Sequence, residues 1–166
     1  MTDDHAVPYP HFQVNCKIYP GTGGDDGVEF ARIVERVQVD TDATFVFTPQ
    51  VPDLRRIATE TDLAVTTPVV DGVEAGRGIG KILPETIEAA GAVGAVINHA
   101  EARDTLSDID RKIQRCNEVG MDSIVCGDSI EMGGAVAAFD PDSLVFEKQA
   151  EISTDRTFTL THPDLI

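Results

Sequence analysis

The sequence predicts an α/β domain in which parallel strands alternate with helices. Short apolar runs, each followed by a turn and then by an amphipathic run, recur six times along the chain. The apolar runs lack polar alternation, which is typical of parallel strands that helices cover. Six such units fit either an open doubly wound sheet or part of a (β/α)8 barrel, and the periodicity alone does not choose between them.

In the first half of the chain, strands are expected at residues 12–18, 44–48 and 63–67. Apolar residues at helical spacing predict a helix over about 26–39; they are Phe30, Ile33, Val34 and Val37. Asp53 is expected to cap a short second helix. Residues 71–80 are too rich in glycine for a helix or a strand. Pro84 is expected to begin a helix that ends before Gly91.

The second half gives cleaner patterns. Strands are expected at 93–98, 123–126 and 143–146, and Glu147 ends the last one. A helix that Gly120 terminates lies after the first of these strands. Its expected buried stripe consists of Leu106, Ile109, Ile113 and Cys116. Residues 135–139 are assigned to the helix before the last strand.

One domain is expected over residues 1–166, with residues 1–11 as a polar N-terminal extension. This extension has no apolar segment typical of a secretory signal, so a cytoplasmic location is expected. No apolar run reaches the length of about 18 residues that a membrane helix needs. Cys16, Cys116 and Cys126 are widely spaced and odd in number, which favours free thiols in a reducing compartment.

The chain carries 29 acidic and 13 basic residues, for a net charge of -16. Such a field repels nucleic acid and anionic membranes, so neither is an expected partner. The acidic residues are scattered along the chain and do not form a single tail. A dispersed acidic surface with few lysines indicates adaptation to high salt, where screening removes the self-repulsion.

Polar residues at the ends of three predicted strands are the candidate site. They are Asn15 and Lys17 after the first strand, His99 and Glu101 after the fourth, and Glu147 after the sixth. Each also has an ordinary structural explanation: a lysine that extends to the rim, a hydrogen-bonded core histidine, or a carboxylate that caps a helix. No Walker motif and no GxGxxG follows the first strand, which disfavours a nucleotide site.

Together these residues suit the removal of a proton next to a carbonyl group. Both candidate architectures gather the carboxyl ends of their strands at one edge. A carboxylate there takes the proton, an imidazole polarises the carbonyl, and a lysine stabilises the negative charge of the enediolate.

Two motifs resemble those of the triosephosphate isomerase family. Asn15-Cys16-Lys17 is similar to the family's N-x-K signature, and residues 98–103, Asn-His-Ala-Glu-Ala-Arg, resemble its G/N-H-S-E-x-R segment. Residues 83–94, 48–55 and 123–126 resemble the short archaeal form of the family. The resemblance covers residues 12–164, with the motifs in the family's order.

The resemblance implies a (β/α)8-type barrel of which six βα units are present, so an incomplete barrel. It implies interconversion of dihydroxyacetone phosphate and glyceraldehyde 3-phosphate without a cofactor or a metal. In that reaction Glu147 would be the base, His99 the neutral electrophile, and Lys17 and Asn15 would bind substrate, with Glu101 supporting Lys17. A homo-oligomer is also expected.

The sequence departs from the family pattern in four places. Ala100 replaces a serine of the motif, and residues 76–80 differ from the G-S-H-T-G loop that packs on a neighbouring subunit in the family. The lid after the base lacks its usual glycines; its candidate residues are Lys148, Ser153, Thr154 and Asp155. The chain ends at Ile166, before the strands that supply the family's phosphate grip.

These departures leave other expectations open. The sequence is either a fragment of a longer product, a chain that a second copy completes, or one that has lost activity. The alternative function is a non-catalytic or divergent barrel relative that binds a small sugar or sugar phosphate. A third is an isomerase whose substrate lacks phosphate, since Asp155 in the lid would repel a phosphate dianion.

Overall fold

The structure, a computed structural model, describes residues 6–147 of the chain. Six parallel strands form one sheet in which each strand pairs with its neighbours in sequence, in the order β1-β2-β3-β4-β5-β6. The strands are β1 (Phe12–Asn15), β2 (Phe45–Thr48), β3 (Ala64–Thr67), β4 (Ala92–Ile97), β5 (Asp122–Gly127) and β6 (Ser143–Phe146).

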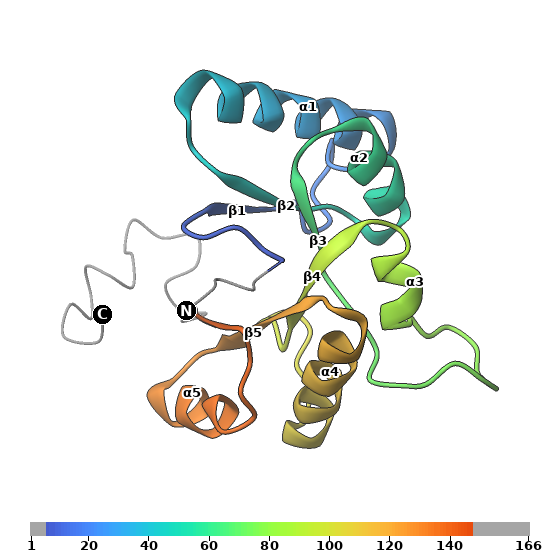
Figure 1. Cartoon of the computed structure of the whole chain (residues 1–166), viewed down its shortest axis with the longest axis vertical. Helices are drawn as coiled ribbons and strands as arrows, with labels where there is room; N and C mark the ends of the chain where they lie inside the picture. The colour runs from blue at the N-terminus through green and yellow to red at the C-terminus, as the bar shows by residue number, and fades with distance from the viewer. Residues whose placement is uncertain (1–5, 148–166) are drawn as a thin grey trace.

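The helices follow the strands in turn and lie around the outside of the sheet (Figure 1). They are α1 (Gly24–Thr41), the 3-10 turn η1 (Val51–Asp53), α2 (Leu54–Glu60), α3 (Pro84–Glu88), α4 (Leu106–Val119) and α5 (Ile130–Ala137). A doubly wound sheet changes direction in its strand order and carries helices on both faces. The sequential order and single helical layer are those of a (β/α)8-type barrel, here an incomplete one of six units.

The hydrophobic core has two layers, as the alternation of side chains along a strand requires. The larger layer lies between the sheet and the helices and includes Phe47, Ile97 and Ile113. The smaller one lies on the other face, where Val7 packs with Val46 and Ile124. The sheet is therefore buried on both faces along much of its length.

Residues of the predicted N-terminal extension contribute to that inner layer. The backbone N–H groups of Ala6 and Val7 donate hydrogen bonds to the Asp122 carboxylate, at 3.1 and 2.9 Å. Gly94 leaves room for the contact, because a Cβ there would lie 3.0 Å from the Val7 side chain. Asp122 therefore anchors this segment at the amino end of the sheet.

The prediction that the first strand continues to residue 18 is wrong. β1 ends at Asn15, whose side-chain oxygen accepts a hydrogen bond from the Lys17 backbone at 3.0 Å. Lys17 then adopts a left-handed conformation, with φ of 48°. Apolar character continues past the strand, but this turn ends the pairing and places Lys17 at the edge of the sheet.

Asp53 occupies the capping position of α2, but its side chain does not cap that helix. Its carboxylate instead accepts a hydrogen bond of 2.8 Å from the backbone of Gly24, the first residue of α1. Two other predicted helix ends are confirmed. Pro84 begins α3, and Gly120 terminates α4 in the left-handed conformation.

Leu106, which was predicted to belong to a buried stripe, is exposed, as are Ile33 and Val37 on α1. Leu106 is the first residue of α4, before the helix turns its stripe of Ile109, Ile113 and Cys116 towards the sheet. The last helix begins at Ile130, five residues before the range predicted for it, and ends at Ala137, two residues before that range ends.

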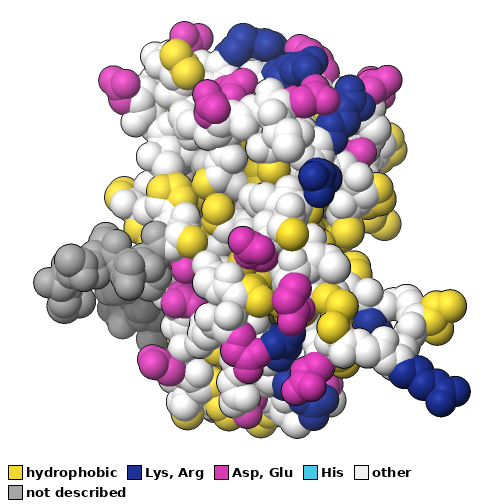
Figure 2. Space-filling model, turned by 45° about the vertical axis from the view of Figure 1, so that its right-hand side comes forward, with side chains coloured by type: hydrophobic (Ala, Val, Ile, Leu, Met, Phe, Trp, Pro, Cys, Tyr) yellow, Lys and Arg dark blue, Asp and Glu magenta, His cyan; other side chains and the backbone are white. Residues whose placement is uncertain are grey.

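The three cysteines are free and buried, as predicted. Within residues 6–147, no helix is both long and apolar enough to cross a membrane. Acidic side chains are dispersed over the face in Figure 2, and the basic ones lie mainly towards its right-hand side. This distribution agrees with the scattering of acidic residues along the sequence.

Candidate active site

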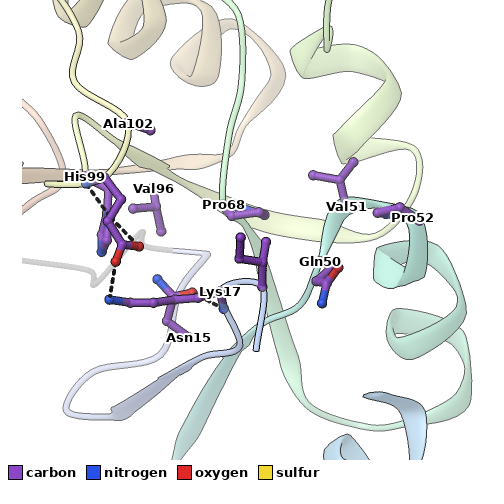
Figure 3. Close-up of a pocket in the computed structure, with 11 residues that line it drawn as sticks. Asn15, Lys17, Gln50, Val51, Pro52, Pro68, Val96, His99 and Ala102 are labelled. Carbon is purple, nitrogen blue, oxygen red and sulfur yellow. Dashed lines mark hydrogen bonds and ion pairs between the residues drawn. The ribbon is translucent and has the colours of Figure 1, made fainter. Parts of the chain in front are cut away.

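The five predicted site residues come from three strand ends on the same edge of the sheet. From the end of β1, Lys17 extends across this edge, and its Nζ lies 3.2 Å from Oε1 of Glu101 (Figure 3). The turn that Asn15 stabilises therefore sets the direction of the lysine. Glu101 is more exposed than Lys17, so the pair fixes the ammonium group at the mouth of the site.

His99 follows β4 and lies beside the same pair. Its side chain is only 11% exposed. The backbone N–H of Glu101 donates to His99 Nδ1 at 3.2 Å. A donor at Nδ1 selects the tautomer that carries its proton on Nε2. The ring is thus oriented to donate from Nε2.

Glu147 approaches His99 from that side. Its backbone N–H donates to Gly127 O at 2.9 Å, which continues the pairing of β6 with β5 beyond the strand end. Its Oε2 lies 3.6 Å from His99 Nε2. The same oxygen is buried and has no hydrogen-bond partner among the described residues. A buried acceptor without a partner is costly, so within residues 6–147 this oxygen is open to an interaction with a ligand.

A pocket of about 420 Å³ opens beside these groups and includes Asn15, Lys17, His99 and Glu101 in its lining. The opposite wall is apolar, and Figure 3 shows Val51, Pro52 and Pro68 across from Lys17. Glu147 is not part of this lining and reaches the site through His99.

Cys126, near the end of β5, interacts electrostatically with the carboxylate of Glu147. Burial first, and then the Glu147 carboxylate, raise the pKa of the Cys126 thiol to about 12. A thiol with that pKa is neutral near pH 7 and is a poor nucleophile. Among residues 6–147, no group of three or more His, Cys, Asp or Glu side chains is arranged to hold a metal ion.

Two further contacts hold the loop that carries His99 and Glu101. Arg103 pairs with Asp128 of the next loop at 2.7 Å. Asn98 and Asp104 form hydrogen bonds with each other at the base of the loop. No role was predicted for Asp104, because an Asp in a polar loop gives no signal of its own. The predicted lid residues Lys148, Ser153, Thr154 and Asp155 lie outside the described residues.

Comparison with known proteins identifies relatives over most of the chain. A model of the triosephosphate isomerase family matches residues 10–150. The triosephosphate isomerase of Methanocaldococcus jannaschii is 34% identical over 153 residues, which are 92% of this chain and 70% of that protein. That of Methanobacterium bryantii is 33% identical, over 92% of this chain and 68% of its own length.

Among solved structures, triosephosphate isomerase from Bartonella henselae has a similar fold, with a TM-score of 0.68. The sequence identity is 15%, and the match covers 80% of this chain and 61% of that one. At this identity the likeness concerns the fold alone. The chain thus spans about 70% of the length of the curated relatives and 61% of this structure.

Proposed function

Because the chain belongs to the triosephosphate isomerase family, we propose that it interconverts dihydroxyacetone phosphate and glyceraldehyde 3-phosphate. The observation that carries this proposal is the approach of Glu147 Oε2 to within 3.6 Å of His99 Nε2. A base and a hydrogen-bond donor so close together can act on neighbouring atoms of one small substrate.

Glu147 is proposed as the base that removes a proton from the carbon next to the substrate carbonyl. Its Oε2 is buried and has no hydrogen-bond partner in the described part of the chain. The C–H bond breaks, its electrons form the C=C bond of an enediolate, and the carbonyl oxygen takes the negative charge. The Glu147 proton then returns to the adjacent carbon, so the reaction consumes no other reagent.

His99 is proposed as the group that polarises the carbonyl. With Nδ1 occupied by the Glu101 N–H, its proton lies on Nε2, the nitrogen on the Glu147 side. A donor placed where charge develops lowers the barrier more than one that binds the ground state equally well. His99 would also carry a proton between the two oxygens of the enediolate.

Lys17 is proposed to bind substrate and to stabilise the negative charge of the enediolate, with Asn15 beside it. Its Nζ is held by Glu101 and lines the pocket. The pair leaves the ammonium group near the pocket while Glu101 sits further into solvent. This arrangement agrees with a supporting role for Glu101.

The test is an isomerisation assay on glyceraldehyde 3-phosphate with the 166-residue chain and its Glu147→Gln variant. The amide keeps the shape of the side chain but cannot accept the proton. We expect turnover to fall by about 10²- to 10⁴-fold, the usual contribution of a positioned base. Glu88→Gln, at an exposed position on α3, is the matched control and should keep full activity.

Equal rates for the wild type and Glu147→Gln would refute the role of Glu147. A folded chain without turnover would refute the isomerase function for these 166 residues. Binding of triose phosphate without exchange of a substrate proton with solvent would then identify a non-catalytic relative.

We also propose that the protein forms a homo-oligomer through the segment of residues 73–81, here called the contact loop. It projects away from the body of the molecule between β3 and α3 (Figure 1). Ile79 within it is 96% exposed, although isoleucine is usually buried. The complementary surface is the apolar rim of the pocket, where Ile18, Val51 and Pro52 lie.

Finally, we propose that the protein is adapted to high salt. Its net charge of -16 is carried by acidic residues spread over the surface, as Figure 2 shows for one face. Self-repulsion of this size destabilises a compact chain unless ions screen it.

A further inference from the structure

The loop between β4 and α4, residues 98–105, is closed at its base by a pair of reciprocal hydrogen bonds. The Asn98 backbone N–H donates to Asp104 Oδ2, and the Asp104 backbone N–H donates to Asn98 Oδ1, both at 3.0 Å. Lys112 of α4 adds an ion pair to Asp104 Oδ1 at 2.6 Å. We call Asn98, Asp104 and Lys112 the loop clamp.

The loop clamp fixes an uncommon backbone conformation at Asn98. Asn98 is buried and has a φ of 58°, in the left-handed region. Asparagine enters this region more readily than most residues other than glycine, because its short polar side chain can form local hydrogen bonds, and here those bonds fix it. Besides the bonds to Asp104, the Asn98 side chain donates to Cys126 O on β5 at 2.8 Å. The loop clamp thus ties the end of β4 to both β5 and α4.

The ion pair of the loop clamp is largely removed from solvent. The side chains of Lys112 and Asp104 are 12% and 15% exposed. Such a pair contributes little net stability relative to apolar groups, but the removal of one partner leaves a buried charge alone. We therefore expect the ion pair to orient the Asp104 carboxylate. Lys112 binds one carboxylate oxygen, and the other accepts the hydrogen bond from the Asn98 N–H.

The segment that the loop clamp closes carries the two groups on which the site depends. His99 follows Asn98 directly, so the left-handed turn sets the direction of its side chain. The Ala102 N–H donates to His99 O at 2.8 Å, and the Glu101 N–H donates to His99 Nδ1 at 3.2 Å. Residues 101–103 are exposed, so contacts at the base of the loop must supply its order.

We propose that Asp104 is a positioning residue for the isomerisation. Held by Lys112 and acting through Asn98, it fixes His99 in the orientation that presents Nε2 towards Glu147. This inference rests on the proposed function, but the orientation of His99 can be measured without turnover.

The kinetic test compares Asp104→Ala with Asp104→Asn. Alanine removes both bonds that the Asp104 side chain makes, whereas asparagine keeps an oxygen for the Asn98 N–H. A displacement of about 1 Å can cost about 100-fold in rate. We therefore expect kcat to fall by about 10- to 100-fold in Asp104→Ala, with KM within about 3-fold because Lys17 and Asn15 remain in place. Asp104→Asn should recover most of kcat.

Thr105→Val is the matched control for lost stability. Thr105 caps α4 by accepting a hydrogen bond from the Asp108 N–H at 3.1 Å. Valine removes this cap beside Asp104 but leaves the loop clamp intact, so kcat should stay within about 3-fold of the wild type. An equal loss of kcat in Thr105→Val and Asp104→Ala would overturn the proposal, because it would reflect stability alone.

The second readout is the 15N NMR spectrum of the His99 ring, assigned with His99→Gln. The wild type should show an unprotonated Nδ1 and a protonated Nε2. Asp104→Ala should show a mixture of tautomers, and Asp104→Asn should restore the wild-type pattern. An unchanged pattern in Asp104→Ala would overturn the proposal even if the wild type does not turn over.

If Asp104→Ala does not fold, Lys112→Met and Asp104→Asn are compared in the same way. The proposal would be overturned if both variants gave the wild-type spectrum of the His99 ring and the wild-type kcat.

Discussion

At the scale of single residues, Asp71 shows how one carboxylate closes a long loop. Its two oxygens accept hydrogen bonds from Lys81 Nζ and from the Ile82 backbone, both at 2.8 Å. Burial alone would raise the pKa of Asp71, but these bonds outweigh it and leave the pKa below its usual range. The contact loop, residues 73–81, therefore emerges from a base that is fixed by a charged group.

We predict that Asp71→Asn destabilises the protein by about 1 kcal/mol at pH 7, because a charge-assisted hydrogen bond is lost. A carboxyl group whose pKa is lowered by folding stabilises the native state above its unfolded pKa of about 3.9. This stability disappears as the pH falls through the lower, native pKa. The difference between Asp71→Asn and the wild type should therefore shrink as the solution is acidified below the unfolded pKa and vanish below the native pKa.

Urea unfolding of the wild type and Asp71→Asn measures the difference in free energy of unfolding at pH 7 and again at low pH. Asp140→Asn is the control, since Asp140 is exposed and its left-handed φ of 56° suits asparagine equally well. A difference for Asp71→Asn that persists unchanged in acid would show that the carboxylate charge is not its source.

Residue types and motifs selected the members of the candidate site but did not predict their geometry. Lys17, His99 and Glu147 could be selected because each follows an apolar run at a strand end. The left-handed turns at Lys17 and Asn98 could not be predicted, because they depend on side-chain bonds that form only after folding. Asp104 was missed for the same reason, since its hydrogen bonds to Asn98 and Lys112, six and eight residues away, form only after folding.

At the scale of elements, strands were predicted well where both faces are buried and less well elsewhere. β4 is apolar throughout and was found within one residue at each end. The range predicted for α5 starts too late in the sequence, because Gly133 and Gly134 weaken its helical signal. A Cβ at Gly133 would lie 2.5 Å from Cζ of Phe146 on β6, so the Phe146 ring would have to move to admit a side chain there. Local propensity and tertiary packing thus conflict at this helix.

The contact loop gives the prediction at this scale. If Ile79 inserts at the apolar rim of a second copy, Ile79→Asp should place a charge in that interface and shift the protein to monomers. Size-exclusion chromatography with light scattering measures the mass. Ile130→Asp, at another exposed isoleucine on α5, is the matched control and should leave the mass unchanged. A wild type that is already monomeric would contradict the proposed oligomer.

At the scale of the whole molecule, the sequential strand order decides between the two architectures that the periodicity left open. Each strand pairs with the one before it, and the helices cover one face. Periodicity reports only how a strand is buried, and both architectures bury it on both faces. The order of strands is a long-range property, which the family motifs indicated and the local pattern could not.

The acidic surface gives the prediction for the whole molecule. Raising KCl from about 0.2 M to about 2 M should increase Tm by at least about 5 °C, because screening reduces the repulsion among 29 acidic residues. Differential scanning calorimetry measures the change. Sucrose at the same osmolality is the control, since it favours the compact state without screening charge. A Tm that stays constant or falls with KCl would refute adaptation to salt.

The Asp122 anchor has a consequence for how the protein forms during synthesis. Each new strand can pair with its predecessor as soon as it leaves the ribosome, because neighbours in the sheet are neighbours in sequence. Ala6 and Val7 are the exception, since their hydrogen bonds reach Asp122, 116 and 115 residues away. Ala6 and Val7 must therefore wait for the fifth strand before they can form these hydrogen bonds, and until then the contact of Val7 with Ile124 on the inner face of the sheet cannot form.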